Sequence, residues 1–216
     1  MRDVLRTLLC DLLGIEYPVI QSGMGSVAGP DLVAEVSRAG GLGVLAGLNV
    51  APDELRSRIR QVRALTVRPF GVNLWLHTEL RPPADPATIP DDRLAAVQSV
   101  LNGFRSRLGL PVRSARPGAV PDIIASQIEV ILEERPRVFS IGLGDPGPEL
   151  VLRCRAEGIK VVAMVSTVED ARAVVASGVD VVVAQERGRR TSFDVGQEAV
   201  ARSGECRRDG ASPPDR

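Results

Sequence analysis

Residues 17–26 read Tyr-Pro-Val-Ile-Gln-Ser-Gly-Met-Gly-Ser, and they predict a short buried strand that runs into a glycine loop. We expect the strand over residues 19–21. Gly23 and Gly25 lack a Cβ atom, so the loop backbone can adopt positive φ and lie close to a flat ligand. Gly29-Pro30-Asp31 predicts the start of a helix, with proline first and an acid in the first turn. Such a loop is either a ligand-binding loop of an α/β protein or an ordinary strand-to-helix turn.

The same alternation of strand and helix continues to residue 185. Further strands are predicted at residues 42–45, 70–75, 138–141, 160–165 and 179–184. Helices are predicted to begin near residues 30, 52, 94, 121, 148 and 167, and a short helix at residues 3–13 lies outside the main fold. The later strands are runs of β-branched residues, which is typical of a parallel sheet that is buried on both faces.

Regular strand–helix repetition allows either an open doubly wound sheet or a closed eight-stranded barrel. Residues 23–28 lack the third glycine of the G-x-G-x-x-G motif, which counts against a doubly wound dinucleotide site. Six repeats do not fill a barrel of eight. We therefore predict an α/β fold in which residues 1–185 form an incomplete TIM (β/α)8-type barrel. It would have about six parallel strands with flanking helices, and two open edges.

The composition favours a packed soluble chain and argues against binding to nucleic acid or to a membrane surface. The 216 residues include 27 basic and 27 acidic side chains, with 44% hydrophobic and only 3% aromatic residues. No apolar run reaches the roughly 20 residues that span a bilayer. Cys10, Cys154 and Cys206 show neither metal-ligand nor disulfide spacing, which indicates reduced thiols in a cytoplasmic protein.

Two of the predicted helices have a clear apolar stripe. In the helix that begins at Pro52, the stripe consists of Leu55, Ile59, Val62 and Leu65. Its other face carries Arg56, Arg58, Arg60 and Arg63, which we expect to be solvated. In the next helix, the stripe consists of Leu94, Val97, Leu101, Phe104 and Leu108.

Residues 186–216 differ from the rest of the chain. They contain seven arginines and six acids, few large apolar residues and no periodic face. Such a composition buries too little apolar surface to offset the entropy of ordering, so we expect a divergent and mostly disordered tail.

Four segments occur in an order and at a spacing that resemble one enzyme family. They are Gly-Ile-Glu-Tyr-Pro-Val-Ile-Gln (14–21) with Gly-Met-Gly (23–25), Gly-Gly-Leu-Gly-Val (40–44), Pro-Phe-Gly-Val-Asn (69–73) and Val-Asp-Val-Val-Val-Ala-Gln (179–185). The family is that of the nitronate monooxygenases, also called 2-nitropropane dioxygenases, which are FMN-dependent TIM barrels. The resemblance covers roughly residues 10–185 and implies oxidation of alkyl nitronates with O₂ to a carbonyl compound and nitrite.

The resemblance also implies a set of flavin-contacting residues. In the family the first-strand loop lies against the flavin, which corresponds here to Gln21, Ser22, Gly23 and Met24. Asn73 and Gln185 match family residues that lie near the flavin ring. Without the resemblance, Asn73 is equally a turn residue at a strand end, and Met24 is core filler.

The segment after Gln185 departs from the family. Relatives continue with a glycine-rich segment that contains the catalytic histidine, whereas this chain reads Glu-Arg-Gly-Arg-Arg at residues 186–190. The sole histidine, His77, lies four residues after Asn73 and is a weak catalytic candidate, with an exposed loop position as the alternative. Asp145 follows the fourth strand, where we favour a helix-start acid over a catalytic one.

The departure suggests a shifted reading frame after Gln185 and again after Gly196, which sequencing of the locus in independent isolates would test. The family holds the FMN phosphate after its seventh and eighth strands, for which this sequence shows no segment, so the resemblance implies weak FMN binding. Two alternatives stay open: a catalytically silent partial barrel, and a relative of FMN-dependent enoyl-carrier-protein reductases. The sequence leaves the oligomeric state open.

Overall fold

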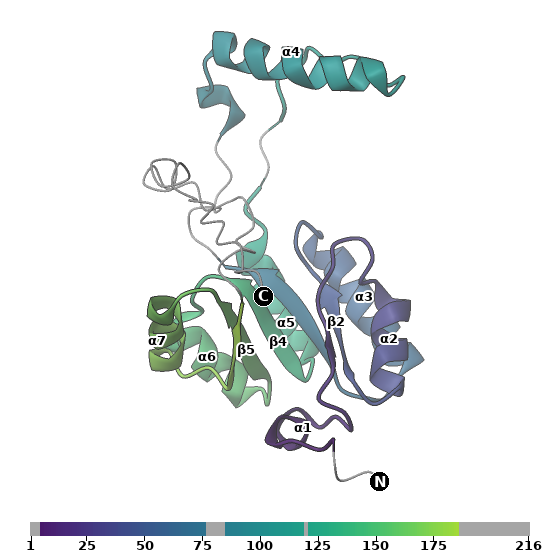
Figure 1. Ribbon diagram of the computed structural model, residues 1–216, viewed down its shortest axis with the longest axis vertical. Coiled ribbons are helices and arrows are strands. Elements are labelled where there is room, and N and C mark those ends of the chain that lie inside the picture. Colours follow the sequence, from purple (N-terminus) through teal and green to yellow (C-terminus); the bar gives the residue numbers. More distant parts are fainter. Residues whose placement is uncertain (1–4, 77–84, 119–120, 186–216) are drawn as a thin grey trace, which may run out of the picture.

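The computed structural model describes residues 5–76, 85–118 and 121–185 (Figure 1). Over these residues, six parallel strands form one sheet in the order β1-β2-β3-β4-β5-β6. The strands are β1 Ile20–Gln21, β2 Leu42–Ala46, β3 Phe70–Trp75, β4 Val138–Leu143, β5 Lys160–Val165 and β6 Val181–Ala184. A doubly wound sheet reverses its strand order at a switch point, whereas neighbouring barrel strands follow the sequence. The predicted incomplete barrel is therefore confirmed.

The helices lie mainly around the outside of this sheet (Figure 1). They are α1 Leu8–Leu13, α2 Pro30–Arg38, α3 Pro52–Leu65, α4 Asp91–Arg107, α5 Ile124–Glu134, α6 Gly147–Ala156 and α7 Val168–Ala176, with a 3-10 turn at Pro86–Thr88. Their starts agree with the sequence signals. For example, the Thr167 side chain accepts a hydrogen bond from the Asp170 amide, 3.0 Å away, and so caps α7.

Both faces of the sheet are largely buried in β2 to β5, as the β-branched runs predict, whereas β6 is half exposed. The outer face packs against the helices in a cluster that includes Leu45, Leu55 and Phe139. On the inner face, Cys10 and Leu13 of α1 belong to a second cluster, whose strand members are Leu42, Val44, Val138 and Val162. Because Leu42 and Val138 are the first residues of their strands, α1 covers the amino end of the inner face.

The junction between α2 and β2 depends on one glycine. A Cβ atom at Gly43 would lie 2.2 Å from the Val33 carbonyl oxygen, which is closer than atoms can approach. The backbone of α2 therefore lies directly on β2, and this brings the helix that follows the first glycine loop close to the sheet.

Three sequence predictions about the fold need correction. The short first helix does not lie outside the main fold, because Cys10 and Leu13 of α1 are buried in the inner cluster. The first strand is not buried: it covers only residues 20–21 and pairs with β2 alone, so Val19, just before it, is 60% exposed. The apolar stripe of α4 is not covered by the barrel either. Two helices, α4 and α5, connect β3 to β4; α5 is the one that packs against α3, and no residue of α4 is buried. Figure 1 shows α4 standing apart from the sheet. His77, Cys206 and the tail 186–216 lie outside the described residues.

Candidate functional site

The predicted site residues lie at the end of the sheet where the carboxyl ends of the strands meet, which we call the carboxyl edge. Gln21 ends β1, Asn73 lies in the second half of β3, and Gln185 directly follows β6. In the strand register, Asn73 is paired with Ala46 of β2 and with Ser140 of β4. Because all the strands are parallel, their carboxyl ends meet at this edge, which is where α/β barrels hold their ligands.

The glycine loop and Asn73 are in direct contact. A Cβ atom at Gly23 would lie 2.8 Å from the Asn73 Cβ, so only glycine allows the loop backbone to cross this side chain. The structure thus brings together two segments that lie 50 residues apart in the sequence. Their predicted convergence is found.

Asn73 is a buried residue inside β3 and not a turn residue. Its Nδ2 donates to the Ser140 carbonyl oxygen at 3.1 Å and to the Ser140 Oγ at 3.2 Å. Its own carbonyl oxygen accepts a hydrogen bond from the Gly47 amide, 3.0 Å away. Contacts from β4 and from the loop after β2 therefore fix the position of Asn73.

Gln21 uses its side chain to hold the loop in place. The Gln21 Nε2 donates to the Val44 carbonyl oxygen at 3.1 Å, and its Oε1 accepts from the Val44 amide at 3.3 Å. The side-chain amide thus pairs with the main chain of β2 as a strand residue would. A second contact joins Nε2 to the Ser22 carbonyl oxygen. We conclude that Gln21 positions the loop that follows it.

The remaining predicted residues are more open. Ser22 is exposed and Met24 is 46% exposed, so Met24 is not core filler. Gln185 is half-buried, and its Nε2 lies 3.6 Å from the Met164 sulfur of β5. Gln185 shares the sheet edge with Asn73, but its hydrogen bonds are to β5.

Sequence reasoning missed three neighbours of Asn73. Ser140 accepts both hydrogen bonds from its amide. A Cβ atom at Gly142 would lie 2.7 Å from the Trp75 indole and 3.2 Å from the Asn73 Nδ2, so Trp75 lies directly on Gly142. Gly142 is the last residue but one of β4 and lies beside a glycine-rich turn, and this likeness to the first loop was the signal that could have found it.

Asp145 has a structural role, as favoured from the sequence. Its Oδ1 accepts a hydrogen bond from the Gly147 amide at the start of α6, and its Oδ2 accepts one from the Ser177 hydroxyl, both at 3.0 Å. The residue therefore joins the start of α6 to the end of α7.

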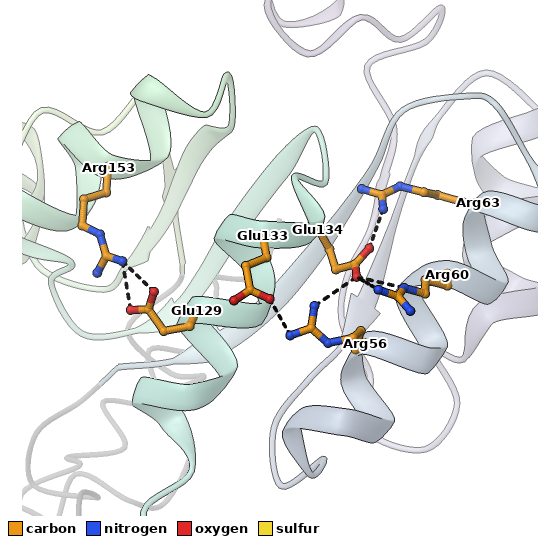
Figure 2. A network of polar contacts seen from close by, with 7 residues as sticks. All are labelled: Arg56, Arg60, Arg63, Glu129, Glu133, Glu134 and Arg153. Atoms are coloured by element: carbon orange, nitrogen blue, oxygen red, sulfur yellow. Dashed lines mark hydrogen bonds and ion pairs between the residues drawn. The ribbon is translucent and has the colours of Figure 1, made fainter.

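The arginine face of α3 is not simply solvated, and this prediction was wrong for three of its four members. Figure 2 shows Arg56, Arg60 and Arg63 converging on Glu134 of α5, at 3.2, 2.8 and 2.7 Å. The Glu134 side chain is only 7% exposed. Burial would raise the pKa of Glu134, but hydrogen bonds from Arg60 and Arg56 outweigh it, so the pKa lies below its ordinary value of 4.5.

This charged network lies between two outer helices and makes a poor candidate for the active site. A shallow hollow of about 450 Å³ lies over α3, and Arg56 and Arg60 line it. Both arginines are already paired with glutamates of α5. The network therefore acts as a clamp between α3 and α5.

Other reactive groups in the described residues are buried or dispersed. Cys10 and Cys154 are buried free thiols. Burial raises the pKa of the Cys154 thiol to about 11, so it is protonated at neutral pH and a poor nucleophile. In the described ranges, no cluster of His, Cys, Asp or Glu could hold a metal ion, and no helix has the length and apolarity to cross a membrane.

The strand order and the glycine-lined edge define an incomplete parallel α/β barrel with its candidate site at the strand carboxyl ends. A sequence model described as nitronate monooxygenase matches residues 6–200. The chain belongs to this family. The match continues beyond Gln185 into the segment that departs from the family motif.

Individual relatives agree with this assignment. A nitronate monooxygenase of Pseudomonas aeruginosa is 40% identical over 181 residues, which cover 81% of this chain and 48% of the relative. A solved nitroalkane oxidase of Streptomyces ansochromogenes is similar with a TM-score of 0.68 at 32% identity, over 83% of this chain and 48% of that one. A FabK (M276A) mutant of Thermotoga maritima gives a TM-score of 0.60 at 29% identity, over 83% and 46%. The chain spans about half the length of the curated relatives it matches.

Proposed function

We propose that this chain forms the flavin-facing edge of a nitronate monooxygenase that uses FMN and O₂ to convert an alkyl nitronate into a carbonyl compound and nitrite. One observation carries the proposal: the glycine loop crosses directly over Asn73 at the carboxyl edge of the sheet. This is where the family resemblance expects the flavin ring.

The residues at this edge suit a flat, largely uncharged ring. Gly23 packs directly on Asn73 and Gly142 packs directly on the Trp75 indole, so the backbone lies close to both side chains there. Asn73 contacts the neutral residues Ser140, Gly23 and Gly142, and Met24 of the glycine loop is exposed. Ser22, Gly23, Met24, Asn73 and Gln185 would hold the ring. FMN, when bound, would supply the redox chemistry.

The chain's own residues contribute positioning. Gln21 fixes the loop on β2, and Ser140 fixes the amide of Asn73. The loop would cover one side of the ring and exclude water from it. A catalytic base is not assigned, because the family position falls in residues 186–190 and His77 is a weak candidate; both lie outside the described residues.

We also propose that residues 1–185 act as one domain in the cytoplasm, with residues 186–216 as a separate tail. The buried free thiols of Cys10 and Cys154 support a reducing compartment. The neutral charge balance supports a small-molecule substrate rather than nucleic acid.

The proposal is tested by titrating purified protein with FMN and following flavin fluorescence, then measuring nitrite release and O₂ uptake with an alkyl nitronate. We expect Asn73→Ala to weaken FMN binding about tenfold, which corresponds to about 1.4 kcal/mol. Asn102→Ala on α4, away from the sheet edge, is the matched control and should leave FMN binding unchanged.

The same assay separates the alternatives. Bound FMN without nitrite release indicates a catalytically silent partial barrel. Reduction of an enoyl thioester without nitrite release indicates an enoyl reductase. No FMN binding at saturating concentration contradicts the proposed flavin site.

A further inference from the structure

Helix α5 carries a fully buried side-chain amide, that of Gln127. Its Nε2 donates two hydrogen bonds, to the Gly47 carbonyl oxygen at 2.7 Å and to the Val50 carbonyl oxygen at 2.6 Å. Its Oε1 is the single buried side-chain oxygen or nitrogen in the described residues that has no hydrogen-bond partner. An unpaired buried acceptor lowers stability, and an apolar side chain would fill the same space without one. Filling the core therefore does not explain an amide at this position, whereas its two donated hydrogen bonds do.

The two acceptors of Gln127 are the two ends of one tight turn. Gly47 directly follows β2, and the Val50 amide donates to the Gly47 carbonyl oxygen at 3.1 Å, which closes the turn 47–50. Asn49, within the turn, has a φ of 60°, a conformation that asparagine adopts more readily than most residues. Gln127 thus holds both ends of the turn that leads from β2 to α3 at the carboxyl edge of the sheet.

The turn 47–50 contacts Asn73 through its first residue. The Gly47 amide donates to the Asn73 carbonyl oxygen at 3.0 Å, and a Cβ atom at Gly47 would lie 2.9 Å from that same oxygen. On the other side of β3, the pairing with β4 shifts register between Leu74 and Trp75, one residue beyond Asn73. The ladder to β4 is thus irregular at this end of β3, and the hydrogen bond from Gly47 fixes Asn73 from the β2 side.

We propose that Gln127 is a positioning residue of the candidate site: it holds the turn 47–50 against β3 and so fixes Asn73 where the glycine loop crosses it. Its hydrogen bonds reach Asn73 through Gly47, so it acts through the turn and not by touching a ligand. The effect on the turn is independent of what the site binds, whereas the effect on FMN rests on the proposed function.

Hydrogen exchange of the purified chain, followed by NMR, tests the effect on the turn. Gln127→Met fills a similar space but cannot donate to the turn. In this variant the Gly47 amide should lose about tenfold in protection relative to the amides of β4. Ile159→Val, a change in the buried core just before β5, is the matched control and should lower the protection of both alike. An unchanged ratio in Gln127→Met overturns the proposal.

A glutamate at the same position adds a test with pH. Burial raises the pKa of a carboxyl group, and only its protonated form can donate to the turn. In Gln127→Glu, the protection of Gly47 relative to β4 should therefore rise as the pH falls through that pKa. In Gln127→Met the ratio should not change with pH. A role in packing alone predicts the same pH response for both variants, and that result overturns the proposal.

Titration with FMN tests the link to the site. Gln127→Met should bind FMN about threefold more weakly than the wild type, less than the loss for Asn73→Ala because it acts through Asn73. Ile159→Val should bind FMN as tightly as the wild type. Equal affinity of the wild type and Gln127→Met contradicts the link. A wild type that binds no FMN contradicts the proposed function, and hydrogen exchange then decides the role of Gln127.

The wild type alone supplies a further test, which holds even where Gln127→Met does not fold. The side-chain amide protons of Gln127 should exchange about as slowly as the Gly47 amide, and far more slowly than those of Gln61, an exposed residue of α3. Equally fast exchange of the two glutamine side chains overturns the proposal.

Discussion

Helix α3 carries Leu55, Ile59 and Val62 at helical spacing, and α4 carries Val97, Leu101 and Phe104 at the same kind of spacing. The first three side chains are fully buried against the sheet, whereas the second three are half exposed. The stripe therefore predicts which face of a helix is apolar but not what covers it. That depends on the chain's path: α3 follows β2 directly and packs on the sheet, whereas α5 occupies the corresponding place after β3.

The polar faces of the two helices differ in the same way. On α3, Arg56, Arg60 and Arg63 gather on Glu134, which they hold ionised although it is nearly buried (Figure 2). On α4, Asp91 pairs with Arg116, and the Arg105 Nε donates to the Pro111 carbonyl oxygen at 2.6 Å. The charged side chains of α3 therefore join two helices, whereas those of α4 join the helix to the loop that follows it.

The sharpest test of this comparison removes one leucine from each helix. Leu55→Ala should lower the free energy of unfolding by about 2–5 kcal/mol, because it opens a cavity in the outer core. Leu101→Ala should change it by less than about 0.5 kcal/mol, because Leu101 is half exposed. Urea unfolding measures both. Equal losses would show that α4 packs on the barrel after all.

The second test addresses the charged face of α3. Glu134→Gln should destabilise the fold at pH 7 by about 2 kcal/mol, less than for a fully buried pair because Arg60 and Arg63 are partly exposed. Glu133→Gln changes an exposed partner of Arg56 and is the control, with an expected loss below about 0.5 kcal/mol.

The effect of Glu134 should also depend on pH in one direction. Its pKa is lower in the folded state, so the carboxylate contributes fully at neutral pH and its contribution is lost as the pH falls below about 4.5. The gap in stability between the wild type and Glu134→Gln should close there. A gap that widened in acid would contradict this account.

The smallest expected effects come from two glycines in these contrasting environments. Gly23→Ala places a Cβ atom against Asn73 and should destabilise the loop by about 1–2 kcal/mol, with weaker FMN binding. Gly103→Ala in α4 meets no atom within 4 Å and should instead stabilise the helix by about 0.5–1 kcal/mol. Thermal melts and FMN titration follow the two changes. A neutral Gly23→Ala would show that the loop does not cross Asn73 closely.

The meeting of the first loop with Asn73 was implied only by the family resemblance. The sequence by itself determined the alternation of strands and helices, and it favoured an incomplete barrel over a doubly wound sheet. These features follow from periodicity, caps and glycines, which act over a few residues and specify the topology through short connections. For the same reason, the limits of β3 and β5 were predicted without error.

Only the tertiary structure decided what covers each face. It paired Gln21 with the main chain of Val44, buried Glu134 among arginines more than 70 residues away, and left α4 without a partner in the barrel. Burial and pairing depend on which element lies opposite. That is a property of the packed chain, and no local pattern encodes it.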